Sequence, residues 1–206
     1  MTIMTCLGDS ITDCGHCFSS DSLGSGYVKM LADRFRQEGL QVQMRNCGTD
    51  GFTVLRLLQK IKEDKNITSN IITVLIGIND IGMMMNTNRT PFQQNEMMDS
   101  FQKHYSDLLT ILTKQSSKVI LIEPFVFDCP AFYQNWKPLL KKMCRIIQQL
   151  AQHYQLPLIS LQGQLDEMVR RYGYSAITTD GIHLTSQGQQ FLSQCLYSCI
   201  TEHNYV

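Results

Sequence analysis

The sequence lacks several features that would assign the protein to a particular class. No stretch approaches the roughly 20 apolar residues that a membrane-spanning helix needs. Lys and Arg total 18 and Asp and Glu total 18, so neither a basic nucleic-acid-binding face nor an acidic tail is indicated. The N-terminal segment has no basic region followed by a long apolar one, as a signal peptide would have. We therefore expect a cytoplasmic protein that binds neither nucleic acid nor a membrane.

The chain also lacks internal repeats, low-complexity tracts and a linker, so we expect a single domain over residues 1–206. A chain of 206 residues can bury a sizeable core. It contains eight cysteines, which we expect to be free and mostly buried, because thiols stay reduced in the cytoplasm. The sequence leaves the oligomeric state open, and a homo-oligomer is compatible with it.

Apolar residues follow two periodicities that alternate along the chain. Short apolar runs predict strands at 3–7, 40–46, 71–76, 119–122 and 156–160. Apolar residues at helical spacing predict helices at 27–35, 54–61, 97–112, 138–154, 165–172 and 185–200. This alternation predicts an α/β fold, a three-layer α/β/α sandwich around a mostly parallel sheet of about five strands.

Residues 77–95 follow the third strand and are predicted as a long loop that contains Met83, Met84 and Met85. Methionine is a flexible apolar side chain that either fills a core or lines an adaptable binding surface. The sequence leaves both interpretations open. The methionines belong either to a helical turn packed on the core or to a segment at the edge of the site that faces the substrate.

Polar clusters occur where ligands bind in such sheets, outside the carboxyl ends of the strands. They are Gly8-Asp9-Ser10, the segment 46–51, Gly77-Ile78-Asn79-Asp80, and Asp180-Gly181-Ile182-His183 before the last helix. Serine and aspartate are also common helix caps, and glycine is common in turns, so each cluster alone is weak evidence. Their joint occurrence at one edge of one sheet indicates a catalytic site.

The residue types in these clusters fit acyl transfer. Ser10 is the candidate nucleophile, and His183 is the candidate base that takes its proton. Asp180 can fold back onto the Nδ1–H of His183, where it would fix the tautomer and stabilise the imidazolium. The candidate oxyanion donors are the backbone N–H groups of Ser10 and Gly48 and the side-chain amide of Asn79.

With these residues in order, the sequence resembles the SGNH (GDSL) hydrolase family. The segment 8–10 resembles its nucleophile block, Gly48 its glycine block, 77–80 its G-x-N-D block and 180–183 its D-x-x-H block. The resemblance implies a serine esterase with a flavodoxin-like sandwich that needs neither a cofactor nor a metal. Leu184 stands where many members have proline, which changes the stiffness of that turn and not the chemistry.

Further stretches resemble the intracellular acetylxylan esterases and related carbohydrate acetyl esterases. They are GDSITDCG at 8–15, LGSGYV at 23–28, LIGIND at 75–80 and EPFVF at 123–127. This resemblance implies the removal of small acyl groups, acetyl above all, from an acetylated sugar. The alternatives are a lysophospholipase or thioesterase on the same scaffold, or a binding module that has kept the fold without catalysis.

Cys14-Gly15-His16-Cys17 is a C-x-x-C segment of the kind found in dithiol oxidoreductases. Asp13 precedes it, and a neighbouring carboxylate raises the pKa of a thiol and so makes it less reactive. No second Cys or His pair has the spacing of a zinc site. We therefore interpret both thiols as flanking the loop after the nucleophile turn. The histidines that have no partner pattern in the sequence are His16, His104, His153 and His203.

Overall fold

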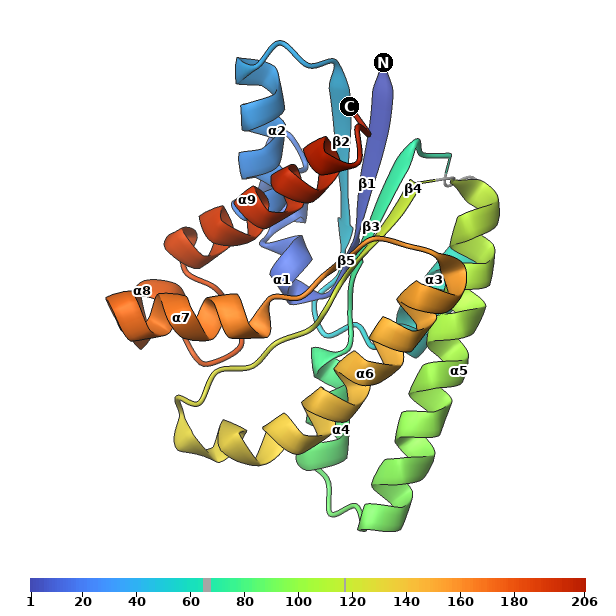
Figure 1. Cartoon of the computed structure of the whole chain (residues 1–206), viewed down its shortest axis with the longest axis vertical. Coiled ribbons are helices and arrows are strands. Elements are labelled where there is room, and N and C mark those ends of the chain that lie inside the picture. Colours follow the sequence, from blue (N-terminus) through green and yellow to red (C-terminus); the bar gives the residue numbers. More distant parts are fainter. Residues whose placement is uncertain (65–67, 117) are drawn as a thin grey trace.

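A computed structural model describes residues 1–64, 68–116 and 118–206. At its centre lies a sheet in which the five strands of the described residues are parallel, in the order β2-β1-β3-β4-β5 (Figure 1). The strands are β1 (Thr2–Gly8), β2 (Val42–Gly48), β3 (Ile71–Leu75), β4 (Lys118–Ile122) and β5 (Leu158–Ile159). Every residue of β3 is buried, as expected for a strand covered on both faces. The predicted α/β sandwich with a parallel sheet is confirmed.

Helices connect the strands and cover both faces of the sheet. The α-helices are α1 (Ser10–Asp13), α2 (Tyr27–Gln37), α3 (Val54–Glu63), α4 (Ile78–Met85), α5 (Pro91–Gln115), α6 (Lys137–Tyr154), α7 (Gln162–Tyr172), α8 (Tyr174–Ile177) and α9 (Ser186–Glu202). Among the described residues, the connections also contain the 3-10 helices η1 (His16–Phe18) and η2 (Ala131–Trp136). No helix in the described ranges is long and apolar enough to cross a membrane.

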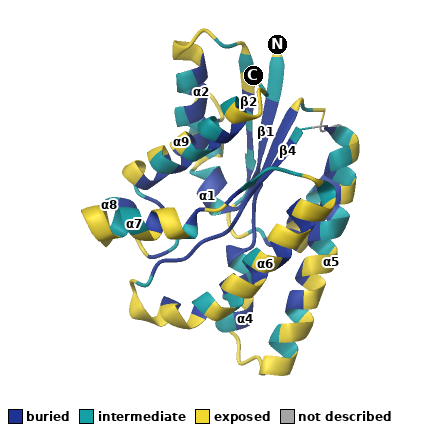
Figure 2. Ribbon diagram, viewed as in Figure 1, coloured by how far each residue is buried: buried dark blue, intermediate teal, exposed yellow. Residues whose placement is uncertain are grey.

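The helices form two outer layers. Helices α2 and α9 pack together on one face of the sheet, and α3, α5 and α6 pack on the other (Figure 1). Their buried sides face the sheet and their exposed sides face outward (Figure 2). In α5 the buried side chains recur at helical spacing, which explains why the sequence predicts this helix. They are Met98, Phe101, Tyr105, Leu108, Leu109 and Leu112.

The prediction of a long loop over 77–95 is wrong. Helix α4 occupies residues 78–85, and α5 begins at Pro91 instead of Met97, so the two helices together cover most of this segment. Thr90 and Gln93 form a capping box there, a signal that the sequence contains. Of the three methionines, Met84 is buried and Met83 is about half exposed, so α4 packs one methionine on the core and presents another outward.

The strand register brings the ends of three strands level. Gly8 at the end of β1 lies opposite both Gly48 of β2 and Leu75 of β3. The segments that follow these strands therefore start at the same edge of the sheet. They contain Ser10 and Asn79, two of the residues that the sequence predicts for the site.

Candidate active site

Ser10 is the first residue of α1, directly after the turn that ends β1. Asp9 is the N-cap of this helix, and its Oδ1 accepts the backbone N–H of Ile11 at 3.1 Å. A Cβ atom on Gly8 would lie 2.2 Å from Thr12 Oγ1 and 2.6 Å from the carbonyl oxygen of Leu75, so only glycine fits there. The tight turn and the cap together position the Ser10 hydroxyl at the edge of the sheet.

His183 and Asp180 reach Ser10 from the segment before α9. Asp180 Oδ1 accepts the backbone N–H groups of Ile182 at 2.9 Å and of His183 at 2.8 Å. Asp180 Oδ2 lies 2.6 Å from His183 Nδ1, and His183 Nε2 lies 2.8 Å from Ser10 Oγ. Because an ionised carboxylate only accepts, Nδ1 carries the proton and Nε2 is free to accept the serine proton. The structure thus brings together the three residues that the sequence singles out.

The charge on Asp180 is favoured by its hydrogen bonds. Burial by itself would raise the pKa of Asp180, but the hydrogen bonds from His183 and Ile182 outweigh it and hold the pKa below its ordinary value. The side chains of Asp180 and His183 are 49% and 46% exposed, so solvent and substrate can reach the pair.

Two further carboxyl groups lie close to the site. Burial raises the pKa of Asp9 to about 7, and its Oδ2 has no hydrogen-bond partner within the described residues. Burial likewise raises the pKa of Asp80 to about 7. Asp80 Oδ2 accepts the backbone N–H of Val54 at 3.0 Å, so Asp80 holds the start of α3. Asp9, whose Oδ1 caps α1, is thus a hydrogen-bonding residue of its turn.

Of the predicted oxyanion donors, Ser10 and Asn79 have free N–H groups. The backbone N–H of Ser10 makes no hydrogen bond with the rest of the described chain. Asn79 Nδ2 donates to the carbonyl oxygen of Phe52 at 2.9 Å, which leaves its second hydrogen free. This bond also ties Asn79 to the turn that follows β2.

The structure contradicts the prediction for Gly48. Its backbone N–H already donates to Asn46 Oδ1 at 3.0 Å. A Cβ atom on Gly48 would lie 2.3 Å from the backbone nitrogen of Asp13, so the glycine is needed for close packing against α1. The Asn46 amide also donates to the carbonyl oxygen of Thr12 at 2.7 Å. Gly48 therefore supports the nucleophile segment and does not face the oxyanion.

Gly51 is a candidate donor that the sequence analysis missed. It lies in the turn after β2 with a φ of +70°, a conformation that favours glycine. Its backbone N–H has no partner among the residues that the structure describes. The next residue, Phe52, is the one that receives the Asn79 amide. The sequence contains the signal, since segment 46–51 has two glycines, Gly48 and Gly51. It does not show which of the two has a free backbone N–H.

A cavity of about 370 Å³ lies between α3, α4 and α5. Its apolar lining includes Met83, Met84, Met97 and Phe101. Asp80, the neighbour of Asn79 in sequence, also lines it. Among the described residues, no group of three or more His, Cys, Asp or Glu side chains could hold a metal ion.

The sequence matches the model of the GDSL-like Lipase/Acylhydrolase family over residues 6–191. Because the match covers most of the chain, the protein belongs to this family. It is a carboxylic ester hydrolase. No curated protein matches the sequence.

Solved structures with the same fold include two hydrolases. LAE5, an alpha/beta hydrolase enzyme from the metagenome of Lake Arreo in Spain, is 21% identical with a TM-score of 0.81, over 97% of this chain and 95% of LAE5. Axe2, an acetylxylan esterase from Geobacillus stearothermophilus, is 23% identical with a TM-score of 0.80, over 97% of this chain and 94% of Axe2. At these identities the likeness shows the fold.

Proposed function

We propose that the enzyme hydrolyses esters through an acyl-enzyme formed on Ser10. The observation that carries the proposal is the continuous chain of hydrogen bonds from Ser10 Oγ through the His183 ring to Asp180. His183 Nε2 takes the hydroxyl proton as Ser10 Oγ attacks the ester carbonyl, and it then gives this proton to the leaving alcohol. Water, deprotonated by the same nitrogen, releases the acid and restores Ser10. Asp180 stabilises the imidazolium that forms in each step.

The oxyanion of each tetrahedral intermediate needs donors that already point at it. We assign this role to the backbone N–H groups of Ser10 and Gly51 and to the free hydrogen of Asn79 Nδ2. Gly51 replaces Gly48 in this set because the Gly48 N–H donates to Asn46.

Asn79→Ala should lower kcat about 10²–10³-fold and leave KM nearly unchanged, because the amide binds charge that exists only in the transition state. Steady-state kinetics on an acetyl ester measure both constants. Asn86→Ala, at the exposed C-terminal end of the same helix, is the matched control and should behave as the wild type. A raised KM with unchanged kcat would instead make Asn79 a residue that binds the substrate ground state.

For the substrate we propose an acetyl ester of a carbohydrate. Three observations support this choice. The stretches at 8–15, 23–28, 75–80 and 123–127 resemble carbohydrate acetyl esterases. A structure of the same fold is described as an acetylxylan esterase. His183 and Asp180 are about half exposed, which leaves room for a bulky sugar alcohol beside Ser10.

One observation favours a second candidate, a lysophospholipase or thioesterase. The cavity beside Asp80 carries apolar side chains of α4 and α5 among polar ones such as Arg89 and His104, and these apolar side chains could contact a longer acyl chain. In that case the exposed Met83 would contact the acyl chain, which corresponds to the substrate-facing interpretation of the methionines.

A series of acyl esters of increasing chain length decides between the two. A methylene group that an apolar pocket does not accommodate costs ~1–3 kcal/mol, so we expect kcat/KM to fall at each step from acetyl to butyryl to octanoyl. A higher kcat/KM for octanoyl than for acetyl would establish the lipase-like candidate. Met83→Trp would then lower only the octanoyl rate, whereas Phe92→Trp, an exposed position on α5 outside the cavity lining, would not. For the acetyl candidate, a panel of acetylated sugars follows.

A further inference from the structure

The sequence contains a second D-x-x-H segment, Asp13 to His16, and in both segments the carboxylate contacts the backbone N–H and the Nδ1 of the histidine. Asp13 Oδ1 accepts the backbone N–H of His16 at 3.1 Å and lies 2.6 Å from His16 Nδ1. In the active site, Asp180 contacts the same two groups of His183 but with two oxygens: Oδ1 accepts the backbone N–H and Oδ2 lies against Nδ1. The carboxylate of Asp13 therefore leaves the proton on Nδ1, and Nε2 of His16 is free to accept a proton.

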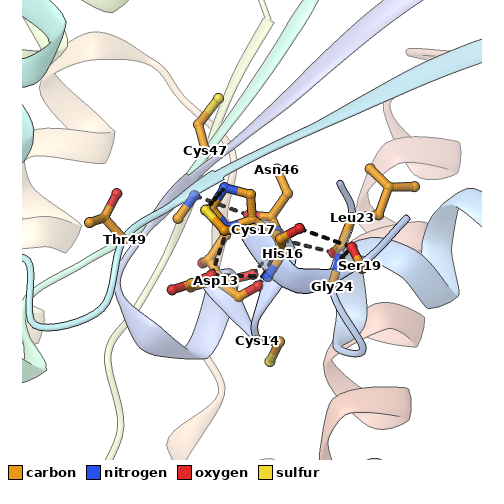
Figure 3. Close-up of polar contacts among 12 residues, drawn as sticks. Asp13, Cys14, His16, Cys17, Ser19, Leu23, Gly24, Asn46, Cys47 and Thr49 are labelled. Carbon is orange, nitrogen blue, oxygen red and sulfur yellow. Dashed lines mark hydrogen bonds and ion pairs between the residues drawn. The ribbon is translucent and has the colours of Figure 1, made fainter. Parts of the chain in front are cut away.

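The group that faces this nitrogen is a thiol. Cys17 Sγ lies 3.4 Å from His16 Nε2, and Cys17 is exposed (Figure 3). The side chains of Asp13 and His16 are only 20% and 18% exposed, so the pair that supports the thiol is better shielded than Asp180 and His183. This cluster thus has the same three roles as the active site, with Asp13 as the acid, His16 as the base and the sulfur of Cys17 as the nucleophile in place of the serine oxygen.

The segment that carries these residues is anchored to the sheet. The Asn46 amide donates to the carbonyl oxygens of Thr12 and Leu23 at 2.7 and 2.9 Å, and so ties the segment to β2 (Figure 3). Ser19 Oγ donates to the carbonyl oxygen of His16 at 3.0 Å. These bonds hold His16 beside Cys17 before any reagent arrives.

Cys14 does not complete a dithiol pair with Cys17. Its sulfur donates to the carbonyl oxygen of Ile11 at 3.3 Å and receives the Gln189 amide at 3.0 Å, and Figure 3 shows it pointing away from Cys17. Burial, with a smaller effect of the Asp13 charge, raises the pKa of Cys14 to about 11. The C-x-x-C segment therefore presents one accessible thiol and one inert thiol.

We propose that Cys17 is a nucleophilic modification site that reacts with small disulfides, with His16 as its base and Asp13 as the residue that positions the base. The thiol proton moves from Sγ to His16 Nε2, and the thiolate attacks one sulfur of the disulfide R–S–S–R. The bond between Cys17 Sγ and that sulfur forms as the S–S bond of the reagent breaks. The departing thiolate takes the proton from Nε2 and leaves as R–SH, so Cys17 is oxidised and the reagent is reduced. This step does not depend on ester hydrolysis at Ser10.

The test is the rate of reaction of the full-length protein with dithiodipyridine, a disulfide that releases a coloured thiol. Cys129 is the internal control, because it is the other exposed cysteine and no imidazole contacts its sulfur in the described structure. At pH 6 an ordinary thiol is almost wholly protonated, so we expect Cys17 to react at least about tenfold faster than Cys129. The fast phase should release one equivalent, disappear in Cys17→Ser and persist in Cys129→Ser. Peptide mass mapping should place one retained pyridyl-thio group on Cys17.

His16→Gln should slow the fast phase to the rate of Cys129. Asp13→Asn keeps the oxygen that contacts His16 but loses the charge that stabilises the imidazolium, so it should slow the fast phase too. It provides a second variant should one of them unfold. Equal rates for Cys17 and Cys129 in the wild type would overturn the proposal. A fast phase that survives in folded His16→Gln would also overturn it. Release of two equivalents with a Cys14–Cys17 disulfide would replace it with a dithiol site.

Discussion

Ser10→Ala is expected to reduce ester hydrolysis by about 10⁴-fold or more while leaving the fold intact. The hydroxyl is the atom that would carry the acyl group, and it is the only part of Ser10 that this substitution removes. Alanine has a high helix propensity, and the cap of α1 is provided by Asp9, so the turn does not need the serine side chain. Initial rates on an acetyl ester measure the effect.

Ser20→Ala is the matched control, since Ser20 is an exposed serine in the same N-terminal region. It should retain the full rate, and thermal unfolding of both variants should match that of the wild type. If Ser10→Ala retained a tenth of the activity, Ser10 would not be the nucleophile. The mechanism would then have to be built on another group.

The sheet could be predicted from the sequence because its strands are buried on both faces. Such strands are continuous apolar runs, and the segment 71–76 is the clearest of them. The grouping of Ser10 with His183 was also predictable. A D-x-x-H spacing lets the carboxylate reach the imidazole locally, and parallel strands place their carboxyl ends at one edge.

The sequence prediction misses three local features. Helix α4 is short and includes Gly82, so it lacks a clear periodic pattern. Gly48 and Gly51 are equally plausible oxyanion donors from the sequence. The structure distinguishes them through the bond from the Gly48 N–H to Asn46. Sequence pattern alone leaves His16 without a partner, although Asp13 stands at the same spacing from it as Asp180 does from His183.

Asp180→Asn is expected to lower kcat by about 10⁴-fold with the local structure preserved. The asparagine Oδ1 can still accept the backbone N–H groups of Ile182 and His183, as Asp180 Oδ1 does. Its NH₂ group, however, would replace Oδ2 and donate to Nδ1 of His183. The imidazole proton would then sit on Nε2, where Ser10 needs an acceptor. The uncharged amide would also no longer stabilise the imidazolium.

Asp13→Asn is the matched control, because it makes the same change in the other D-x-x-H segment. Measuring ester hydrolysis and the disulfide reaction of Cys17 on both variants gives a crossed comparison. Asp180→Asn should lose ester hydrolysis and keep the fast thiol, and Asp13→Asn should keep ester hydrolysis and lose the fast thiol. Full esterase activity in Asp180→Asn would remove Asp180 from the mechanism, since both the tautomer and the imidazolium charge depend on its second oxygen.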